Sequence, residues 1–294
     1  GSLLIGLGKF NQARTVFLEL ARTETQNPSH YSNLGICLSN RNLFEEAITA
    51  FQRALILKPE HAMAWNNLGG ANRDSGHIEA SVRPYRHASA LDPNYAIADW
   101  GLAIVSLMLG DFERGLTLYE RGFECGERIE RFSAKPRWDG QCSLKGKKLL
   151  IVAEQGFGDA IQMARYLVLP ALMEAEIILE VQGPLIPLMT GLRPGLTIIA
   201  KGEDPGPHDF YCPIMSLPLA FATRLESIPA PAAFPLNPDY QKKWAERLGI
   251  PSKRRIGLAW SGNPGHKNDK NRSMPIDALL PLLALDAEFH VVQK

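Results

Sequence analysis

Residues 154–162 combine carboxylates, amides and glycines directly after an apolar run. The segment reads Glu154-Gln155-Gly156-Phe157-Gly158-Asp159-Ala160-Ile161-Gln162. The apolar run at 149–153 predicts a buried parallel strand, and the residues from about Asp159 predict a helix. Ligands of open α/β sheets bind outside the carboxyl ends of such strands. The loop is therefore a candidate ligand site.

Two common nucleotide motifs do not fit this loop. Gly156 and Gly158 lack the third glycine of a dinucleotide fingerprint, and no Gly-Lys-Ser/Thr follows as in a P-loop. Asp159 falls in the first turn of the predicted helix, where capping and the helix dipole stabilise a carboxylate by about 0.3 to 1 kcal/mol. This structural role coexists with any chemical role.

A second polar loop, at residues 261–273, also leaves a predicted strand and enters a predicted helix. Three basic residues, Lys267, Lys270 and Arg272, stand there against one acid, Asp269. The loop precedes a helix start at Pro275, where free N–H groups and basic side chains would stabilise a diphosphate. The alternative interpretation is an ordinary solvated loop.

Alternating strands and helices must position both loops. After a linker at 126–147, apolar runs at 149–153, 177–181, 196–199 and 210–212 predict strands, with helices near 184–192 and 216–225. This alternation over 148–235 favours a doubly wound α/β sheet. Residues 236–294 predict a linker helix at 240–248 and a second series: strands at 255–260 and 289–293 and a helix at 275–284. Two strands and one helix cannot close a sheet layer.

Residues 3–125 repeat with a period of 34. Tyr31-Ser32-Asn33-Leu34-Gly35 aligns with Trp65-Asn66-Asn67-Leu68-Gly69, and Ala47, Phe51, Ala54 and Pro59 align with Ser81, Tyr85, Ala88 and Pro93. This is the period of tetratricopeptide repeats (TPRs), in which small residues let two helices approach and an aromatic ring fills the gap. A degenerate third unit and a partial leading unit bring the α-solenoid to about three and a half repeats.

Asn33 and Asn67 occupy equivalent positions in two successive first helices. Because first helices line the concave surface of such arrays, these residues could form a ladder of amides facing a bound peptide. Gly101 stands at this position in the third unit, so the ladder is short. The alternative is that both asparagines are simply solvated polar residues. Trp65 and Trp100 are interpreted as packing residues.

Composition excludes several function classes. The net charge of +1 gives no basic excess for nucleic-acid binding. The four cysteines form no C-x-x-C pair and no zinc pattern, so we expect reduced thiols in a cytoplasmic protein. We expect no signal peptide and no membrane span, since no run approaches the ~20 apolar residues that a span needs.

Several motifs together resemble a known family. The repeats resemble the TPR region of O-linked N-acetylglucosamine transferase, in which asparagines at the matching position grip an extended peptide. Trp138-Asp139-Gly140, the 154–162 loop, Ser216-Leu217-Pro218, 257–264 and Asn271-Arg272-Ser273 resemble bacterial TPR proteins with a C-terminal glycosyltransferase-like region. That region is similar to ADP-heptose:lipopolysaccharide heptosyltransferases, which have the GT-B fold. The resemblance implies a Rossmann-like acceptor domain at 148–235 and the start of a second Rossmann-like domain.

The same resemblance implies a set of site residues. Asp159 would be the catalytic base of an inverting, metal-independent transfer, with Glu154 in reserve. The acceptor loop would include Gln155, Gly156, Gly158 and Gln162, and the donor phosphates would meet Asn263, His266, Lys267, Arg272 and Ser273. No metal and no cofactor are implied beyond a nucleotide-sugar substrate.

Two functions follow from these motifs. The first is sugar transfer from a nucleotide sugar to an unknown acceptor, with the TPRs recruiting a protein or peptide. The alternative is a non-catalytic TPR interaction scaffold with a degenerate GT-B domain. Because the repeats open inside a unit and the second sheet is incomplete, we expect a longer parent protein and no transferase activity from residues 1–294 alone.

Overall fold

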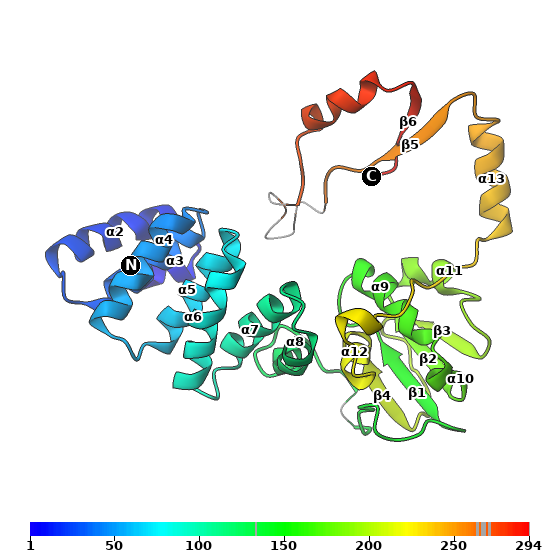
Figure 1. Cartoon of the computed structure of the whole chain (residues 1–294), viewed down its shortest axis with the longest axis horizontal. Helices are drawn as coiled ribbons and strands as arrows, with labels where there is room; N and C mark the ends of the chain where they lie inside the picture. The colour runs from blue at the N-terminus through cyan, green and yellow to red at the C-terminus, as the bar shows by residue number, and fades with distance from the viewer. Residues whose placement is uncertain (133, 263–264, 266–268, 270–271, 294) are drawn as a thin grey trace. The chain divides into compact units, whose positions relative to one another are not determined.

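The computed structural model describes residues 1–293 except 133, 263–264, 266–268 and 270–271. The chain divides into two compact units, Gly1–Pro235 and Leu236–Lys294. The first unit contains a row of helices followed by a parallel sheet, and the second contains a helix, two strands and a 3-10 helix (Figure 1).

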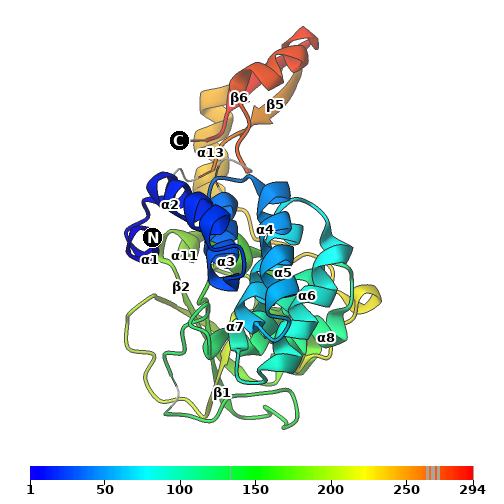
Figure 2. The same ribbon diagram turned by 90° about the vertical axis from the view of Figure 1, so that its left-hand side faces the viewer.

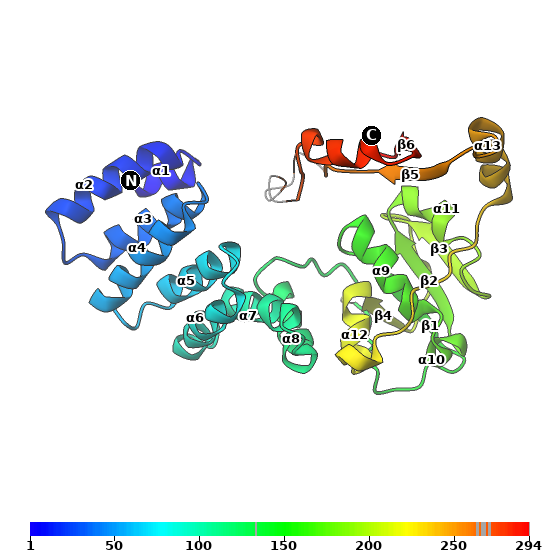
Figure 3. The same cartoon turned by 45° about the horizontal axis from the view of Figure 1, so that its top comes forward.

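The row of helices consists of successive antiparallel pairs (Figures 2 and 3). The pairs are α1 (Ser2–Gly6) with α2 (Phe10–Thr23), α3 (Pro28–Ser39) with α4 (Phe44–Leu57), α5 (Ala62–Asp74) with α6 (Ile78–Leu91), and α7 (Ala96–Met108) with α8 (Phe112–Tyr119), which η1 (Glu120–Phe123) continues. This is the predicted helical repeat array. Lys58 and Asp92, the residues before Pro59 and Pro93, leave the helical conformation, as the proline ring requires.

Glycine and aromatic rings set the spacing between repeat helices. A Cβ on Gly35 would lie 2.6 Å from the Phe51 ring, and one on Gly69 would lie 2.8 Å from the Tyr85 ring. Phe51 and Tyr85 are almost fully buried. Burial of each ring contributes roughly 1.5–3 kcal/mol. The prediction that small residues let two helices approach is confirmed; at these contacts the rings pack within one helix pair.

The sheet of the first unit has four parallel strands in the order β3-β2-β1-β4. They are β1 (Lys148–Val152), β2 (Glu176–Val181), β3 (Leu196–Ala200) and β4 (Phe210–Pro213). Central strand β1 is apolar and buried from its second residue onward, as expected for a parallel strand covered on both faces. The chain thus joins a mostly helical array to a small parallel sheet.

The connecting helices are shorter than predicted, except for α9 (Phe157–Leu167). The helix predicted at 184–192 consists of η2 (Gly183–Leu185) and α11 (Ile186–Met189). The helix predicted at 216–225 consists of η3 (Ile214–Ser216) and α12 (Leu217–Ala220). Two further short helices are α10 (Pro170–Met173) and η4 (Leu225–Ser227). Gly191, with φ of 78°, follows α11, and Ala222, with φ of 47°, follows α12. These left-handed conformations end a right-handed helix.

The segment 126–147, predicted as a linker, is part of the packed structure. Arg128, Trp138 and Leu144 in it are buried. Its backbone runs beside β4, where Trp138 N–H donates to the carbonyl of Tyr211 at 2.8 Å. The segment therefore covers the sheet edge and holds it against the array.

The second unit contains α13 (Pro238–Leu248), β5 (Arg254–Leu258), η6 (Ile276–Ala284) and β6 (Ala287–Val291). Strands β5 and β6 pair in parallel, each starting one or two residues before its predicted position. None of the residues described in this unit is buried. A two-stranded sheet of this kind lacks a core of its own.

Candidate functional site

The first helices of the array carry two equivalent asparagines. Asn33 in α3 and Asn67 in α5 are both half-buried, and the Asn66 amide donates to Asn67 Oδ1 at 3.3 Å. In the third repeat a Cβ on Gly101 would lie 2.2 Å from the Tyr85 ring. This packing explains why glycine replaces asparagine there and limits the ladder to two amides.

The charged groups of these first helices are paired locally. His30 lies 2.7 Å from Glu24, and Arg73 lies 2.8 Å from Asp74. Asp99 is buried and pairs with Arg121 at 3.0 Å. Helices α3, α5 and α7 therefore present amides and apolar side chains rather than a free basic cluster.

Both tryptophans pack against neighbouring side chains, as predicted. The Trp65 ring meets His87 edge-on at 4.5 Å, and its Nε1–H donates to the Pro59 carbonyl at 2.7 Å. Trp100 lies against Tyr119 with ring centroids 4.6 Å apart.

The 154–159 loop lies at the carboxyl end of β1, and Asp159 stands in the first turn of α9. The Asp159 carboxylate is half-buried and accepts the Gly156 N–H at 2.9 Å. This bond satisfies one of the free donors at a helix start, so the predicted capping role is present. A base role for Asp159 stays a prediction.

Glu154, the predicted reserve base, is committed to a buried ion pair. One carboxylate oxygen accepts from Arg128 at 2.7 Å and the other accepts from the Ile214 N–H at 3.1 Å. Its side chain is only 3% exposed. Because both oxygens are occupied and shielded, we withdraw Glu154 as a base and assign it a structural role.

Arg128 is the centre of a polar cluster that joins the array to the sheet. This Arg128 cluster comprises Arg128, Arg137, Glu120, Glu154 and Ser216. The fully buried Arg128 guanidinium donates to Glu120 at 2.9 Å and to Ser216 at 2.7 Å, and Arg137 also pairs with Glu120.

Aromatic rings and burial complete the surroundings of this cluster. The Arg128 guanidinium lies 4.1 Å from the Phe123 ring centroid and 4.8 Å from that of Tyr119. Such contacts stabilise a desolvated cation. Burial raises the pKa of Tyr119, and also that of Cys212, to about 12. Sequence reasoning missed the Arg128 cluster because its members share no local motif.

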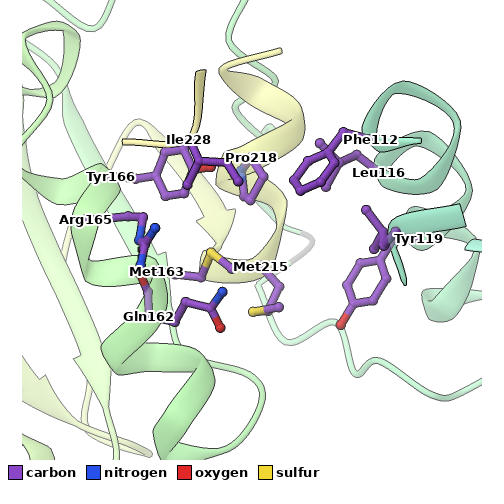
Figure 4. A pocket seen from close by; sticks show the side chains of 11 residues that line it. Phe112, Leu116, Tyr119, Gln162, Met163, Arg165, Tyr166, Met215, Pro218 and Ile228 are labelled. Atoms are coloured by element: carbon purple, nitrogen blue, oxygen red, sulfur yellow. Dashed lines mark hydrogen bonds between the residues drawn. The ribbon is translucent and has the colours of Figure 1, made fainter. Parts of the chain in front are cut away.

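A cavity of about 240 Å³ lies between α8 of the array and α9 of the sheet region. Figure 4 shows Gln162, Met163 and Tyr166 on one side and Phe112 and Tyr119 on the other. The lining is mainly apolar. Of the predicted acceptor-loop residues, Gln162 lines this cavity.

The other acceptor-loop residues lie nearby along the chain. Gln155 bonds to the backbone and side chain of neighbouring segments, donating to the Glu127 carbonyl at 3.5 Å and accepting from the Gln182 amide at 2.6 Å. Gly156 and Gly158 are exposed, and a Cβ on Gly158 would meet nothing within 4 Å. Nothing in the packing around Gly158 therefore requires glycine.

The predicted donor-phosphate residues belong to the second unit. Asn263, His266 and Lys267 lie outside the described residues. Arg272 is exposed, and its backbone N–H donates to the Asp269 carbonyl at 2.8 Å. The Ser273 hydroxyl donates to Asp269 at 2.9 Å and accepts the Gly262 N–H at 2.8 Å, so it stabilises the loop.

Two further properties concern the described part of the chain. Within it, histidine, cysteine and acidic side chains form no group of three or more that could hold a metal ion. None of its helices combines the length and the apolar character needed to cross a membrane.

Comparison with known proteins supports the repeat array. The tetratricopeptide repeat family matches residues 1–56 and 38–86. No curated protein matches the chain. Together with the 34-residue period and the helix pairs, the family match shows that the chain contains tetratricopeptide repeats, which mediate protein–protein interactions.

Several solved TPR structures are similar to the array. They include MamA 41-end from Desulfovibrio magneticus RS-1 (23% identity, 42% of this chain, 70% of that chain, TM-score 0.39), the thermophilic TPR protein TTC0263 from Thermus thermophilus (18%, 44%, 72%, 0.39), and the first TPR of Spaghetti (RPAP3) bound to the HSP90 peptide SRMEEVD (21%, 37%, 86%, 0.36). At these identities and TM-scores the functions of these proteins do not transfer.

Proposed function

We propose that this protein is an interaction scaffold that binds an extended, uncharged segment of a partner protein along α3, α5 and α7. The observation that carries the proposal is the equivalence of Asn33 and Asn67, half-buried and one repeat apart. A side-chain amide both donates and accepts, so it can pair with the N–H and C=O groups of a peptide backbone. Two such amides at the repeat spacing would hold an extended chain in one register.

Charge favours an uncharged peptide. His30, Arg73 and Asp99 are each paired with a neighbour, so the surface offers no free cluster for an acidic tail. Exposed Met63 and Met108 on the first helices add flexible apolar contacts. The peptide's side chains would contribute apolar contact, and its backbone would contribute hydrogen bonds.

An array of immobilised random heptapeptides, probed with residues 1–294, tests this function. Peptides that bind are then titrated in solution by fluorescence anisotropy. We expect the double variant Asn33→Ala/Asn67→Ala to weaken binding about tenfold or more, because two hydrogen bonds of roughly 0.5–1.5 kcal/mol each are lost. Asn40→Ala, at the end of α3, is the matched control. The proposal fails if no heptapeptide binds or if the double variant binds as the parent does.

A second function, sugar transfer from a nucleotide sugar, is favoured by a different observation. The loop before α9 lies at the carboxyl end of β1 in a parallel sheet, where α/β folds bind ligands. In this function Asp159 would take the acceptor hydroxyl proton, and Arg272 with Lys267 would stabilise the departing diphosphate. Asn263 and His266 would donate hydrogen bonds to the phosphates, and Ser273 would hold the loop that carries them. The GT-B assignment belongs to this second proposal.

Calorimetric titration with nucleotide diphosphates and nucleotide sugars separates the two functions. Binding that is lost in Arg272→Ala would support a donor site. If transfer to an acceptor is then found, Asp159→Asn should abolish turnover and leave donor binding intact. If no nucleotide binds, the proposed donor site is refuted, and the peptide-binding function stands alone.

A further inference from the structure

A crevice that the amide ladder does not face lies between the first and second repeats. It lies between α4 and α6, over α5, and has a volume of about 530 Å³. Leu55, Ile56, Trp65 and Pro84 form its apolar walls, and its polar members are Gln52, Asn72 and Arg83. At 100° per residue, Trp65, Leu68 and Asn72 share one face of α5, whereas Asn67 lies on another face. The crevice is therefore separate from the peptide groove proposed above.

The repeat register shows how the sequence opens this crevice. Residues 34 positions apart are equivalent, so Asn72 replaces Leu38 of the first repeat. Leu38 is 6% exposed and belongs to the core of the array. The Asn72 amide instead donates to the Leu68 carbonyl of its own helix at 2.8 Å. A buried polar side chain of smaller volume, bonded back to α5, thus stands where the first repeat has a buried leucine.

The third wall of the crevice, α6, differs from its counterpart in the same way. Pro84 stands at the position of Ala50 and lies inside the helix. Proline has no N–H, so the carbonyl of Ala80 lacks its helical donor. Ala80 and Pro84 both line the crevice. The wall therefore carries a proline ring where the first repeat has an alanine.

Charge at the crevice has one sign. Arg83, at the position of Thr49, lines the crevice, and the exposed Arg86 follows one turn later on α6. Within the described part of the chain, neither arginine forms an ion pair. The lining contains no acidic residue. Ile56 beside it is 69% exposed, which is unusual for an isoleucine.

We infer that this crevice is a second protein-docking site, which takes an acidic segment of a partner protein. An apolar side chain of that segment enters between Leu55, Trp65 and Pro84, and a neighbouring carboxylate pairs with Arg83. Two sites on different faces of one array would let the protein join two partners.

Selection of phage-displayed random dodecapeptides on residues 1–294 provides the probe. Selected peptides are labelled with fluorescein and titrated by anisotropy. We expect a class of peptides rich in Asp or Glu beside a bulky apolar residue. The test variants Asn72→Leu and Arg83→Thr each install the residue that the first repeat carries at that position, so both suit the repeat fold.

The two variants should lower the affinity for this peptide class to different degrees. Asn72→Leu places a bulkier apolar side chain in the crevice wall, narrows the space for the partner's apolar anchor, and should reduce affinity about tenfold. Arg83→Thr should reduce it up to about fivefold and lessen its salt dependence, because one partly exposed ion pair is lost. Arg41→Gln, an exposed arginine in the first repeat, is the control and should bind normally.

The outcomes separate this site from the groove. Peptides that lose binding to Asn33→Ala/Asn67→Ala but keep it to Asn72→Leu belong to the groove and leave the crevice without a ligand. The inference is overturned if no selected peptide is sensitive to both Asn72→Leu and Arg83→Thr, or if the sensitive peptides are basic. Sedimentation velocity adds a further criterion: self-association that Asn72→Leu abolishes would replace the acidic partner with a second copy of the chain.

Discussion

Successive repeats meet through glycine and aromatic rings, whereas the last repeat meets the parallel sheet through buried charge. Within a repeat, Phe51 packs on Gly35 and Tyr85 packs on Gly69; at the junction of the second and third repeats, Tyr85 also lies against Gly101. At the array–sheet junction, Arg128 is fully buried among Glu120, Glu154 and Ser216.

The two junctions should differ in how much stability a single substitution removes. Apolar packing is non-directional and is distributed over many contacts, so its loss is graded. A buried ion pair is directional, and removing one partner leaves the others desolvated without compensation. The array–sheet junction should therefore fail more abruptly than a repeat junction, and it directly holds the loop that begins at Glu154.

The largest expected effect is at the array–sheet junction. Arg128→Ala leaves two carboxylates, Glu120 and Glu154, without their shared cation and should lower the free energy of unfolding by about 3–5 kcal/mol. Urea denaturation followed by circular dichroism measures this change. Arg224→Ala, which removes an exposed ion-pair partner of Glu113, should cost less than about 0.5 kcal/mol. A cost below about 1 kcal/mol for Arg128→Ala would contradict the comparison.

A repeat junction should respond less strongly. Gly101→Ala places a Cβ within 2.2 Å of the Tyr85 ring and should cost about 1–3 kcal/mol through overpacking. Gly70→Ala is a matched control in α5, because its Cβ would meet only the Tyr85 hydroxyl, at 3.5 Å. That control should be neutral or stabilise the helix by up to about 1 kcal/mol. Equal costs for the two variants would refute the proposed role of Gly101.

Loss of the Asp159 cap at the start of α9 should lower stability by a smaller amount. Asp159→Ala removes the acceptor of the Gly156 N–H and should cost about 0.5–1 kcal/mol. Asp159→Asn keeps an acceptor oxygen and should cost less. Thermal unfolding of the two variants measures the difference, and an Asn variant as unstable as the Ala variant would argue against the cap.

The smallest expected effect on stability comes from Cys212, which is buried in the sheet beside the Arg128 cluster, and it is confined to alkaline pH. Burial raises the pKa of this thiol from 9.0 to about 12, so in that pH range the unfolded chain loses a proton that the folded chain keeps. Stability should therefore fall as pH rises from about 9 to about 12, with no contribution below pH 9. Cys212→Ala should reduce the slope of unfolding free energy against pH, whereas Cys142→Ala, at an exposed thiol, should not.

Elements built on local patterns could be predicted from the sequence. The 34-residue period, the small residues Gly35 and Gly69, and the prolines after α4 and α6 identified the array and its helix pairs. The run 149–153 predicted β1, because a buried parallel strand is continuously apolar. The lengths of α11 and α12 were overestimated, because each helix is followed by a residue with positive φ, Gly191 or Ala222, that stops it.

The site residues also divide into those that a local sequence pattern predicts and those that only the folded structure identifies. The equivalence of Asn33 and Asn67 is visible in the repeat register, and the capping role of Asp159 follows from its place in the first turn of α9. Glu154 looked like a free acid beside a glycine loop, yet its partner Arg128 lies 26 positions earlier, in a segment interpreted as a linker. No local pattern connects them.

The repeat array, the position of its amides and the central strand of the sheet follow from residue spacing, because each depends on one helix, one strand or one repeat. The packing of 126–147, the buried ion-pair network around Glu154 and the crevice beside Asn72 are visible only in the folded chain. Those features depend on which distant side chains share a desolvated volume. In such a volume, the partner of a charged group and the neighbours of a side chain come from segments that are far apart in the sequence.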